Sequence, residues 1–114
     1  MSNCIFCRIV AGEIPSKVVL QTELCLAFDD VNPQAPVHVL VIPKIHVESL
    51  HKFQPTEATL MAALLQACRE VADLKGVAET GYRVVANTGA SAGQTVFHMH
   101  FHVLGGRAFA WPPG

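Results

Sequence analysis

The chain has 114 residues and a formal net charge of −1 at pH 7, with 51% hydrophobic and 15% charged residues. This length suits one modest core, so we expect a single domain over residues 1–114, and the apolar fraction excludes a disordered chain. The small net charge argues against a partner such as long nucleic acid, which needs a basic surface. A small phosphorylated ligand needs only a few local donors.

The N-terminus and the cysteines bear on where the protein works. No stretch approaches the 18 apolar residues of a membrane span, and residues 1–4 lack the basic start and apolar core of a signal peptide. We therefore expect a cytoplasmic protein with no membrane partner. In a reducing compartment the four cysteines are expected to be thiols or metal ligands; they are Cys4, Cys7, Cys25 and Cys68.

Hydrophobic patterning, taken in chain order, predicts five strands and one main helix. The predicted elements are a short helical turn near 5–11, strands over 17–21, 24–29 and 37–42, a second short turn near 46–51, a helix over about 56–75, and strands over 82–87 and 95–104. Strands outnumber helices and do not alternate with them regularly. The expected class is therefore α+β, an antiparallel sheet with one face covered by the helix.

The predicted helix over 56–75 has its own start and stop signals. Thr56 is the expected N-terminal cap, and Gly76 is the expected stop. Apolar residues recur at helical spacing and should face the sheet. These are Leu60, Met61, Leu64, Leu65, Cys68, Val71 and Ala72.

The segment His98-Met99-His100-Phe101-His102-Val103-Leu104 is the most informative in the chain. On a strand, alternate side chains share a face, so the three histidines should form one ridge, roughly 6–7 Å apart. The other face should be apolar, supplied by Phe97, Met99, Phe101 and Val103.

Three interpretations of this ridge stay open from its spacing alone. One imidazole can attack phosphorus as a nucleophile, two or three can bind a metal ion, or the ridge can simply face water. The small polar residues just upstream, over 87–95, favour phosphate chemistry, because such loops can direct backbone N–H groups toward an anion.

Other candidate residues have both a functional and a structural interpretation. His38 lies among branched aliphatics, either as a core residue or as the group that orients a catalytic imidazole. Cys4-x-x-Cys7 supplies half of a tetrahedral zinc site, which His46 and one ridge histidine would complete, or is two unconnected thiols. Asp30 precedes a turn and is a candidate for ribose binding, whereas Asp29 is interpreted as a solvated turn residue.

Taken together, these residues resemble the histidine-triad (HIT) family, whose signature is His-φ-His-φ-His-φ-φ with φ apolar. The resemblance is strongest to its Hint branch of nucleotide-binding proteins. It extends over nearly the whole chain, including Gly12-Glu13-Ile14-Pro15, Gly93-Gln94-Thr95-Val96, Gly105-Gly106-Arg107 and Trp111-Pro112-Pro113-Gly114.

The resemblance implies a fold, an activity and a partner. It implies a five-stranded sheet that joins a second copy's sheet in a homodimer, with a purine nucleotide bound in each subunit. The activity implied is hydrolysis of the P–N bond of purine nucleoside 5′-phosphoramidates, with no cofactor required for catalysis. The nucleophile would be His100, which carries the nucleotidyl group, and His38 would support it.

The resemblance also assigns contacts to individual residues. His102, Asn87, Gly93, Gln94 and Thr95 would contact the phosphate, Asp30 the ribose, and Val31 with Ile5 or Phe6 the base, while Trp111 would reach the other subunit's site. Thr95 stands where animal Hint members generally carry serine, and it keeps the hydroxyl that can protonate the leaving group. Cys4, Cys7, His46 and His98 resemble the structural zinc site of zinc-containing members.

Two rival functions remain. Hydrolysis of dinucleoside polyphosphates, as in the Fhit branch, uses the same fold and site, although the tail beginning at Trp111 argues against it. A zinc-bearing nucleotide-binding module with a regulatory or interaction role is the second rival. A comparison of substrates distinguishes these possibilities.

Overall fold

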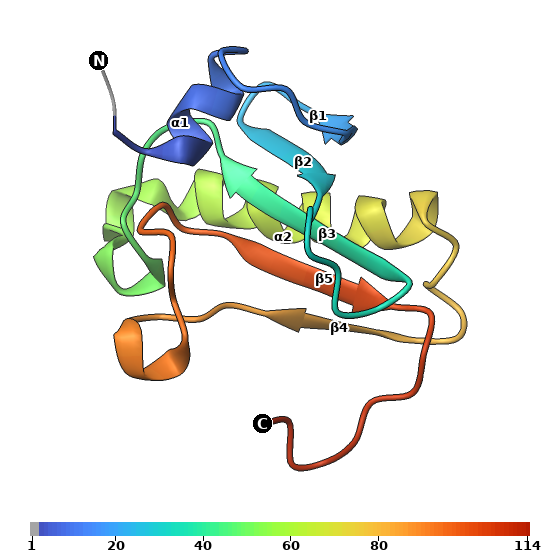
Figure 1. The fold of residues 1–114 in the computed structure, drawn as a ribbon. Helices are drawn as coiled ribbons and strands as arrows, with labels where there is room; N and C mark the ends of the chain where they lie inside the picture. Colours follow the sequence, from blue (N-terminus) through green and yellow to red (C-terminus); the bar gives the residue numbers. More distant parts are fainter. Residues whose placement is uncertain (1–2) are drawn as a thin grey trace.

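Runs of branched and aliphatic residues form five strands, which pair in a single antiparallel sheet in the order β1-β2-β3-β5-β4 (Figure 1). The structure is a computed structural model that describes residues 3–114. The strands are β1 (Val18–Gln21), β2 (Cys25–Asp29), β3 (Val37–Pro43), β4 (Tyr82–Val85) and β5 (Phe101–Gly105). This order places β3 and β5 at the centre, where they are hydrogen-bonded to each other, and leaves β1 and β4 as the edges.

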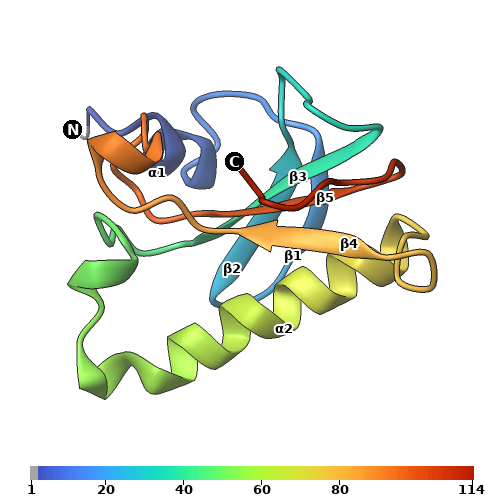
Figure 2. The same cartoon turned by 90° about the horizontal axis from the view of Figure 1, so that it is seen from below.

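The main helix, α2 (Ala58–Leu74), lies across one face of the sheet (Figure 2). Its buried residues recur every three to four positions and pack against Val39, Val41 and Val103 of the central strands. A 3₁₀ turn, Pro55–Glu57, leads into it, with a capping box between Gln54 and Glu57. The helix ends at Leu74, and Gly76, two residues later, has a φ of 72° that lets the backbone turn away.

The short helix α1 (Ile5–Val10) covers part of the opposite face. Its Phe6 is buried in a second apolar cluster with Phe28 and Leu40, and the Phe6 and Phe28 rings meet edge to face at 5.6 Å between centroids. The Sγ atom of Cys4 accepts the Cys7 backbone N–H and so caps this helix. One face of the sheet is thus covered by α2, and the other only in part by α1.

The predicted fold class is confirmed: an α+β chain with a five-stranded antiparallel sheet and one main helix. The first three strands begin and end within one residue of the predicted bounds. The helical turn near 5–11 is present as α1, whereas only Leu50–Lys52 is helical in the turn predicted near 46–51. No helix among residues 3–114 has the length and apolar character needed to cross a membrane.

The strand predicted over 95–104 is wrong at its start, because β5 begins only at Phe101. Extending the register past Val41↔Phe101 would place Met99 opposite Pro43, which has no N–H to donate. The Met99 N–H instead donates to Val47 O at 2.6 Å. Phe97 therefore does not join the core, and it is 47% exposed.

Two details of the predicted helix are also wrong. Thr56 lies within the 3₁₀ turn, and the capping interaction comes from Gln54, two residues earlier. Leu65 is 52% exposed, because the sheet covers a narrower stripe of α2 than the apolar pattern indicates. The strand predicted over 82–87 begins at Tyr82 as expected but ends two residues early, at Val85.

Candidate active site

Three histidine side chains lie on the face of the sheet that α2 does not cover. His98 and His100 are buried. Met99, between them, is also buried, but its side chain points to the other face and belongs to the core cluster under α2. The alternation expected of a strand thus continues beyond the N-terminal end of β5. The His100 and His102 rings are 5.0 Å apart between centroids. The predicted ridge is present, although only its last histidine belongs to a regular strand.

The surroundings of His100 determine which of its ring nitrogens carries a proton. Its Nδ1–H donates to His98 O at 2.7 Å, so the neutral ring keeps its lone pair on Nε2. Every buried side-chain nitrogen and oxygen among residues 3–114 has a hydrogen-bond partner. Because Nε2 of His100 has no such partner, it must reach solvent. The largely buried His100 ring therefore has one nitrogen, Nε2, that reaches solvent with its lone pair, and the Phe6 ring lies edge-on at 5.1 Å between centroids.

His38 and His102 form a hydrogen-bonded pair beside it. The Gln34 backbone N–H donates to His38 Nδ1 at 3.0 Å, which places the His38 proton on Nε2. That Nε2–H donates to His102 Nδ1 at 2.9 Å. A neutral His102 must then carry its own proton on Nε2, and this group has no partner among the described residues. Next to the lone pair of His100 the site thus offers an N–H donor.

Burial keeps both members of this pair neutral. The pKa of His102 is lowered to about 4, mainly by burial and also by the neighbouring His100 and His38, while Asp30 opposes the shift. Burial also lowers the pKa of His38, again against the attraction of Asp30. At neutral pH these rings act as oriented dipoles and not as cations.

Asp30 stands at the edge of this pair. Its Oδ2 lies 3.3 Å from His38 Nε2, and its Oδ1 accepts the Asn32 backbone N–H at 2.8 Å. Val31, the next residue, is fully exposed, and Ile5 on α1 is 46% exposed. These two apolar side chains have solvent around them, as a base-binding residue requires, whereas Phe6 is buried against the histidines. Asp29, interpreted as a turn residue, instead pairs with Lys75 at 3.1 Å.

The loop over 87–95 is braced by Gln94, which is buried. Its Oε1 accepts the Gly89 N–H at 2.9 Å, and its Nε2 donates to Glu48 O and Val96 O. The N–H groups of Gly93 and Gln94 also bond within the loop, to Ala90 O and Gly89 O. The N–H groups of Gly89, Gly93 and Gln94 are therefore engaged within the loop itself. Its other polar side chains are those of Asn87, Thr88, Ser91 and the exposed Thr95.

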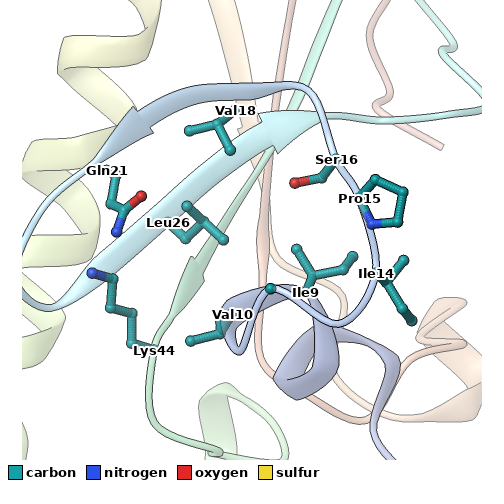
Figure 3. A pocket seen from close by; sticks show the side chains of 10 residues that line it. Ile9, Val10, Ile14, Pro15, Ser16, Val18, Gln21, Leu26 and Lys44 are labelled. Atoms are coloured by element: carbon teal, nitrogen blue, oxygen red, sulfur yellow. The ribbon is translucent and has the colours of Figure 1, made fainter.

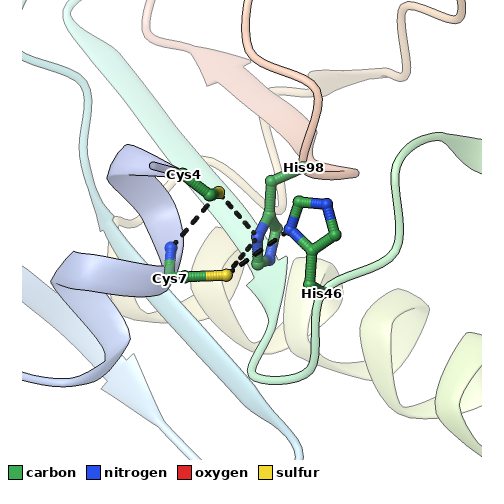
Figure 4. A group of neighbouring side chains, drawn as sticks. All are labelled: Cys4, Cys7, His46 and His98. Atoms are coloured by element: carbon green, nitrogen blue, oxygen red, sulfur yellow. Dashed lines mark hydrogen bonds between the residues drawn. The ribbon is translucent and has the colours of Figure 1, made fainter. Parts of the chain in front are cut away.

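Four residues from three distant segments form a compact group beside α1 (Figure 4). The ligand atoms of Cys4, Cys7, His46 and His98 all lie within 4.8 Å of one another. The Sγ–Nδ1 distances are 3.3 Å from Cys4 to His98, 3.5 Å from Cys7 to His98, and 3.4 Å from Cys7 to His46. The sequence predicted this set of four, and the fold brings all of them together.

This group fits a zinc ion. Zn–S bonds of about 2.3 Å and Zn–N bonds of about 2.0–2.1 Å place sulfur and nitrogen ligands of a tetrahedral ion about 3.5 Å apart. The His98 Nε2–H donates to Pro43 O at 2.8 Å, which leaves the Nδ1 lone pair directed at the two thiols. Closed tetrahedral sites of this composition are structural. Zinc here would join α1, the residues after β3, and the segment before β5.

Asp30, His38 and His102 also bring three ligand atoms within 4.8 Å of one another. This group suits a metal poorly, because the His38 nitrogen that faces the other two carries the proton. Moving that proton to Nδ1 would set it against the Gln34 N–H. The three residues are better suited to a hydrogen bond in which the His38 Nε2–H donates to His102 Nδ1.

Two further features lie apart from the histidine group. Trp111 is 83% exposed, in a C-terminal tail held beside β4 by a hydrogen bond from the Arg83 guanidinium to Ala110 O at 3.0 Å. A cavity of about 270 Å³ lies between α1 and strands β1 and β2 (Figure 3). It is lined by residues that include Ile9, Val10, Ile14, Leu26 and Lys44, and by none of the predicted site residues.

Sequence patterns did not identify the groups that fix the three tautomers. The Gln34 N–H and the carbonyls of Pro43 and His98 are backbone atoms, which every residue type carries. Gln94 was expected to contact phosphate, and nothing in its sequence context indicates a side chain turned inward. These partners become visible only once the strands are placed.

Comparisons with known proteins agree with this fold and site. The sequence model described as the HIT domain matches residues 11–109. An uncharacterized HIT-like protein of Synechocystis is 52% identical over 112 residues, which are 98% of this chain and 97% of that protein. A protein of Zea mays named 14 kDa zinc-binding protein is 47% identical over 115 residues, covering 99% of this chain and 89% of its own length.

Solved structures give the same result. A HIT family hydrolase from Legionella pneumophila superposes with a TM-score of 0.96 at 45% identity, over 98% of this chain and 100% of the other. A HIT family hydrolase from Clostridium thermocellum gives 0.93 at 43% identity, over 96% of each chain. The fold and the histidine-bearing face are those of a HIT domain. This chain belongs to the HIT family.

Proposed function

We propose that the protein is a purine nucleoside phosphoramidase of the Hint branch, which hydrolyses the P–N bond of a nucleoside 5′-phosphoramidate. The observation that carries the proposal is the complementary pair of imidazoles. His100 presents a lone pair at Nε2, and His102 presents an N–H a few ångströms away. A nucleophile beside a fixed donor matches the needs of attack on a phosphoryl group.

In the proposed reaction, His100 Nε2 attacks the α-phosphorus in line with the departing amine. A phosphorus–nitrogen bond to His100 forms as the bond to the amine breaks, and the amine leaves after taking a proton. The His102 Nε2–H donates to a non-bridging phosphate oxygen, where negative charge is concentrated. Water then hydrolyses the nucleotidyl-histidine, which releases a nucleoside monophosphate and restores the neutral ring.

Thr95 is proposed to relay a proton from solvent to the departing amine, so that its own hydroxyl is restored in the same step. It is exposed at the end of the braced loop, and its hydroxyl is the one nearest in sequence to the histidine segment. Asn87 and Gly93, on the same loop, are proposed to lie along the phosphate. Gln94 is proposed to support them by holding the loop, given that its own amide is fully engaged.

The remainder of the nucleotide is assigned to Asp30 and its neighbours. The Asp30 carboxylate is proposed to accept the ribose hydroxyls, and the exposed Val31 and Ile5, with Phe6 behind them, to contact the purine base. Apolar contact alone does not distinguish adenine from guanine. Both AMP and GMP are therefore proposed as products.

A structural zinc ion is proposed at Cys4, Cys7, His46 and His98. The matching distances and the zinc-binding name of the maize relative support it. When bound, zinc would supply a cross-link between segments and no step of the reaction. This chain's own residues carry out every step.

A homodimer is proposed as the working form. β4 is an edge strand whose Tyr82 and Val84 are 36% and 39% exposed, so its backbone is open to pairing with a second copy. The tail with Trp111 lies beside the same edge, which would bring it to the partner's site.

Steady-state hydrolysis of an adenosine phosphoramidate, measured beside a diadenosine polyphosphate, tests the proposal. Faster turnover of the phosphoramidate supports the Hint-type activity. Preference for the polyphosphate would instead assign the chain to the Fhit type. Binding of AMP without hydrolysis of either compound would favour a zinc-bearing nucleotide-binding module.

A further inference from the structure

Gln34 lies between the C-terminal tail and the histidine pair, and its backbone contacts both. Its N–H donates to His38 Nδ1 at 3.0 Å, and its carbonyl accepts from Arg107 Nε at 3.1 Å. Its side-chain amide donates to Asn32 O at 3.0 Å, which closes the turn. One residue thus joins the segment that follows β5 to the ring that orients His102.

A second contact ties the same two segments together. Gly106 has a φ of 87°, and a Cβ added to it would lie 2.9 Å from Cβ of Pro36. The turn before β3 therefore rests directly on the backbone just before Arg107. Pro36 contacts Gly106 and Gln34 is bonded to Arg107, so the position of this turn depends on where residues 106 and 107 lie.

The tail in turn holds Arg107. The Arg107 guanidinium lies 4.3 Å from the centroid of the Phe109 ring, and its Nη1 donates to Ala108 O at 3.0 Å. Arg83 of β4 contacts the same ring at 5.1 Å and donates to Ala110 O. Two arginines thus bind the tail, but only Arg107 also bonds to Gln34.

We infer that Arg107 is a positioning residue that, through Gln34, keeps the proton of His38 on Nε2 and so the proton of His102 on its substrate-facing Nε2. If the Gln34 N–H moved away, His38 could carry its proton on Nδ1 and present a lone pair to His102. His102 would then place its own proton on Nδ1, and its outer nitrogen would turn a lone pair toward the phosphate. The inference rests on the proposed function for its catalytic consequence.

Nitrogen-15 NMR of the imidazole rings tests this directly, because the two neutral tautomers have distinct ring-nitrogen shifts. In the wild type, His38 and His102 should both be Nε2–H forms at neutral pH. Arg107→Ala should give a mixture at both rings, since Asp30 still favours Nε2–H at His38. Arg107→Lys keeps the charge beside Phe109 without an Nε donor, and should give the same mixture.

Arg83→Ala is the matched control, because it loosens the tail without touching Gln34. Its two rings should keep the wild-type shifts. The inference is overturned if the Arg107 variants keep pure Nε2–H rings, or if Arg83→Ala shifts them equally.

In turnover, loss of one hydrogen bond in the relay should lower kcat roughly 3- to 10-fold with little change in KM. Absence of turnover in the wild type would reject the proposed function, while the NMR comparison would still decide this inference.

Discussion

At the scale of single residues, the site works through the direction of three imidazoles, and each direction is set by a backbone group. His98 faces Pro43 O, His100 faces the His98 carbonyl, and His38 receives the Gln34 N–H. All three residues are histidines, so the sequence does not distinguish their rings. Their different roles come from which nitrogen the backbone occupies. The histidine signature therefore predicted that a site exists here, but not how its protons are arranged.

The low pKa of His102 makes stability depend on pH. In the folded protein this pKa is about 4, while the unfolded ring titrates near its ordinary value of 6.5. Between these values the unfolded chain binds more protons, so stability falls as pH decreases from about 6.5 to about 4. Urea unfolding across this range should show the loss, and His102→Asn should reduce it. An identical pH dependence in the variant would contradict the assignment.

Thr95 should matter only when the leaving group needs a proton. Thr95→Ala should slow hydrolysis of an alkylamine phosphoramidate by about 100-fold, within the range of general acid catalysis. A substrate with a fluoride or nitrophenolate leaving group should be much less affected, and Thr95→Ser should stay near the wild-type rate. Equal losses for both substrate types would assign the proton to another group.

Gly105 is required for close packing and not for its backbone angles. A Cβ there would lie 2.9 Å from Cβ and Cγ1 of Val77, in the connection between α2 and β4. Val77 is buried and held by its N–H bond to Ala72 O, so it cannot move aside easily. Gly105→Ala should destabilise the protein by about 1–3 kcal/mol in chemical denaturation. Unchanged stability would mean that the connection carrying Val77 shifts to make room for the added methyl group at no cost.

At the scale of elements, the segment carrying His98 and His100 lies outside the sheet ladder. It is fixed by the Met99 N–H bond to Val47 O and by the contacts of the His98 ring. The sequence pattern could not show this, since the alternation of apolar and polar residues continues through it. The interruption arises from Pro43 on the neighbouring strand, a tertiary effect. The helix, in contrast, was predictable from its own spacing and from Gly76.

Zinc at the Cys4 group should stiffen this segment. Purified wild type should hold about one zinc per chain, and Cys7→Ser should lose most of it. Removal of the zinc should lower Tm and speed amide exchange at Met99. His98 belongs to this segment, and His46 directly precedes Val47, whose carbonyl accepts the Met99 N–H. Cys68→Ser, at a buried cysteine of α2, is the control for a generic loss of a thiol. Exchange at Met99 that is unaffected by zinc would contradict this role.

At the scale of the whole molecule, the two sheet edges differ. β4 carries the exposed pair Tyr82 and Val84, and the C-terminal tail, which includes Trp111, is bonded to it through Arg83 (Figure 1). A charge on this edge should prevent pairing of two sheets. Val84→Glu should elute as a monomer where the wild type elutes as a dimer in size-exclusion chromatography with light scattering. Val18→Glu, at a residue of β1 that is 53% exposed, would test the other edge, which we do not expect to pair. Dissociation by the β1 variant alone would contradict the proposed interface.

The central claim is that His100 carries the nucleotidyl group, and one measurement tests it most directly. An adenosine phosphoramidate is mixed with the wild type, quenched during turnover, and the protein is analysed by peptide mass spectrometry beside His100→Ala. We predict an adenylyl adduct on His100 and a loss of kcat of more than about 1000-fold in the variant, which should still bind AMP. Turnover by His100→Ala near the wild-type rate, or an adduct on another residue, would contradict the account.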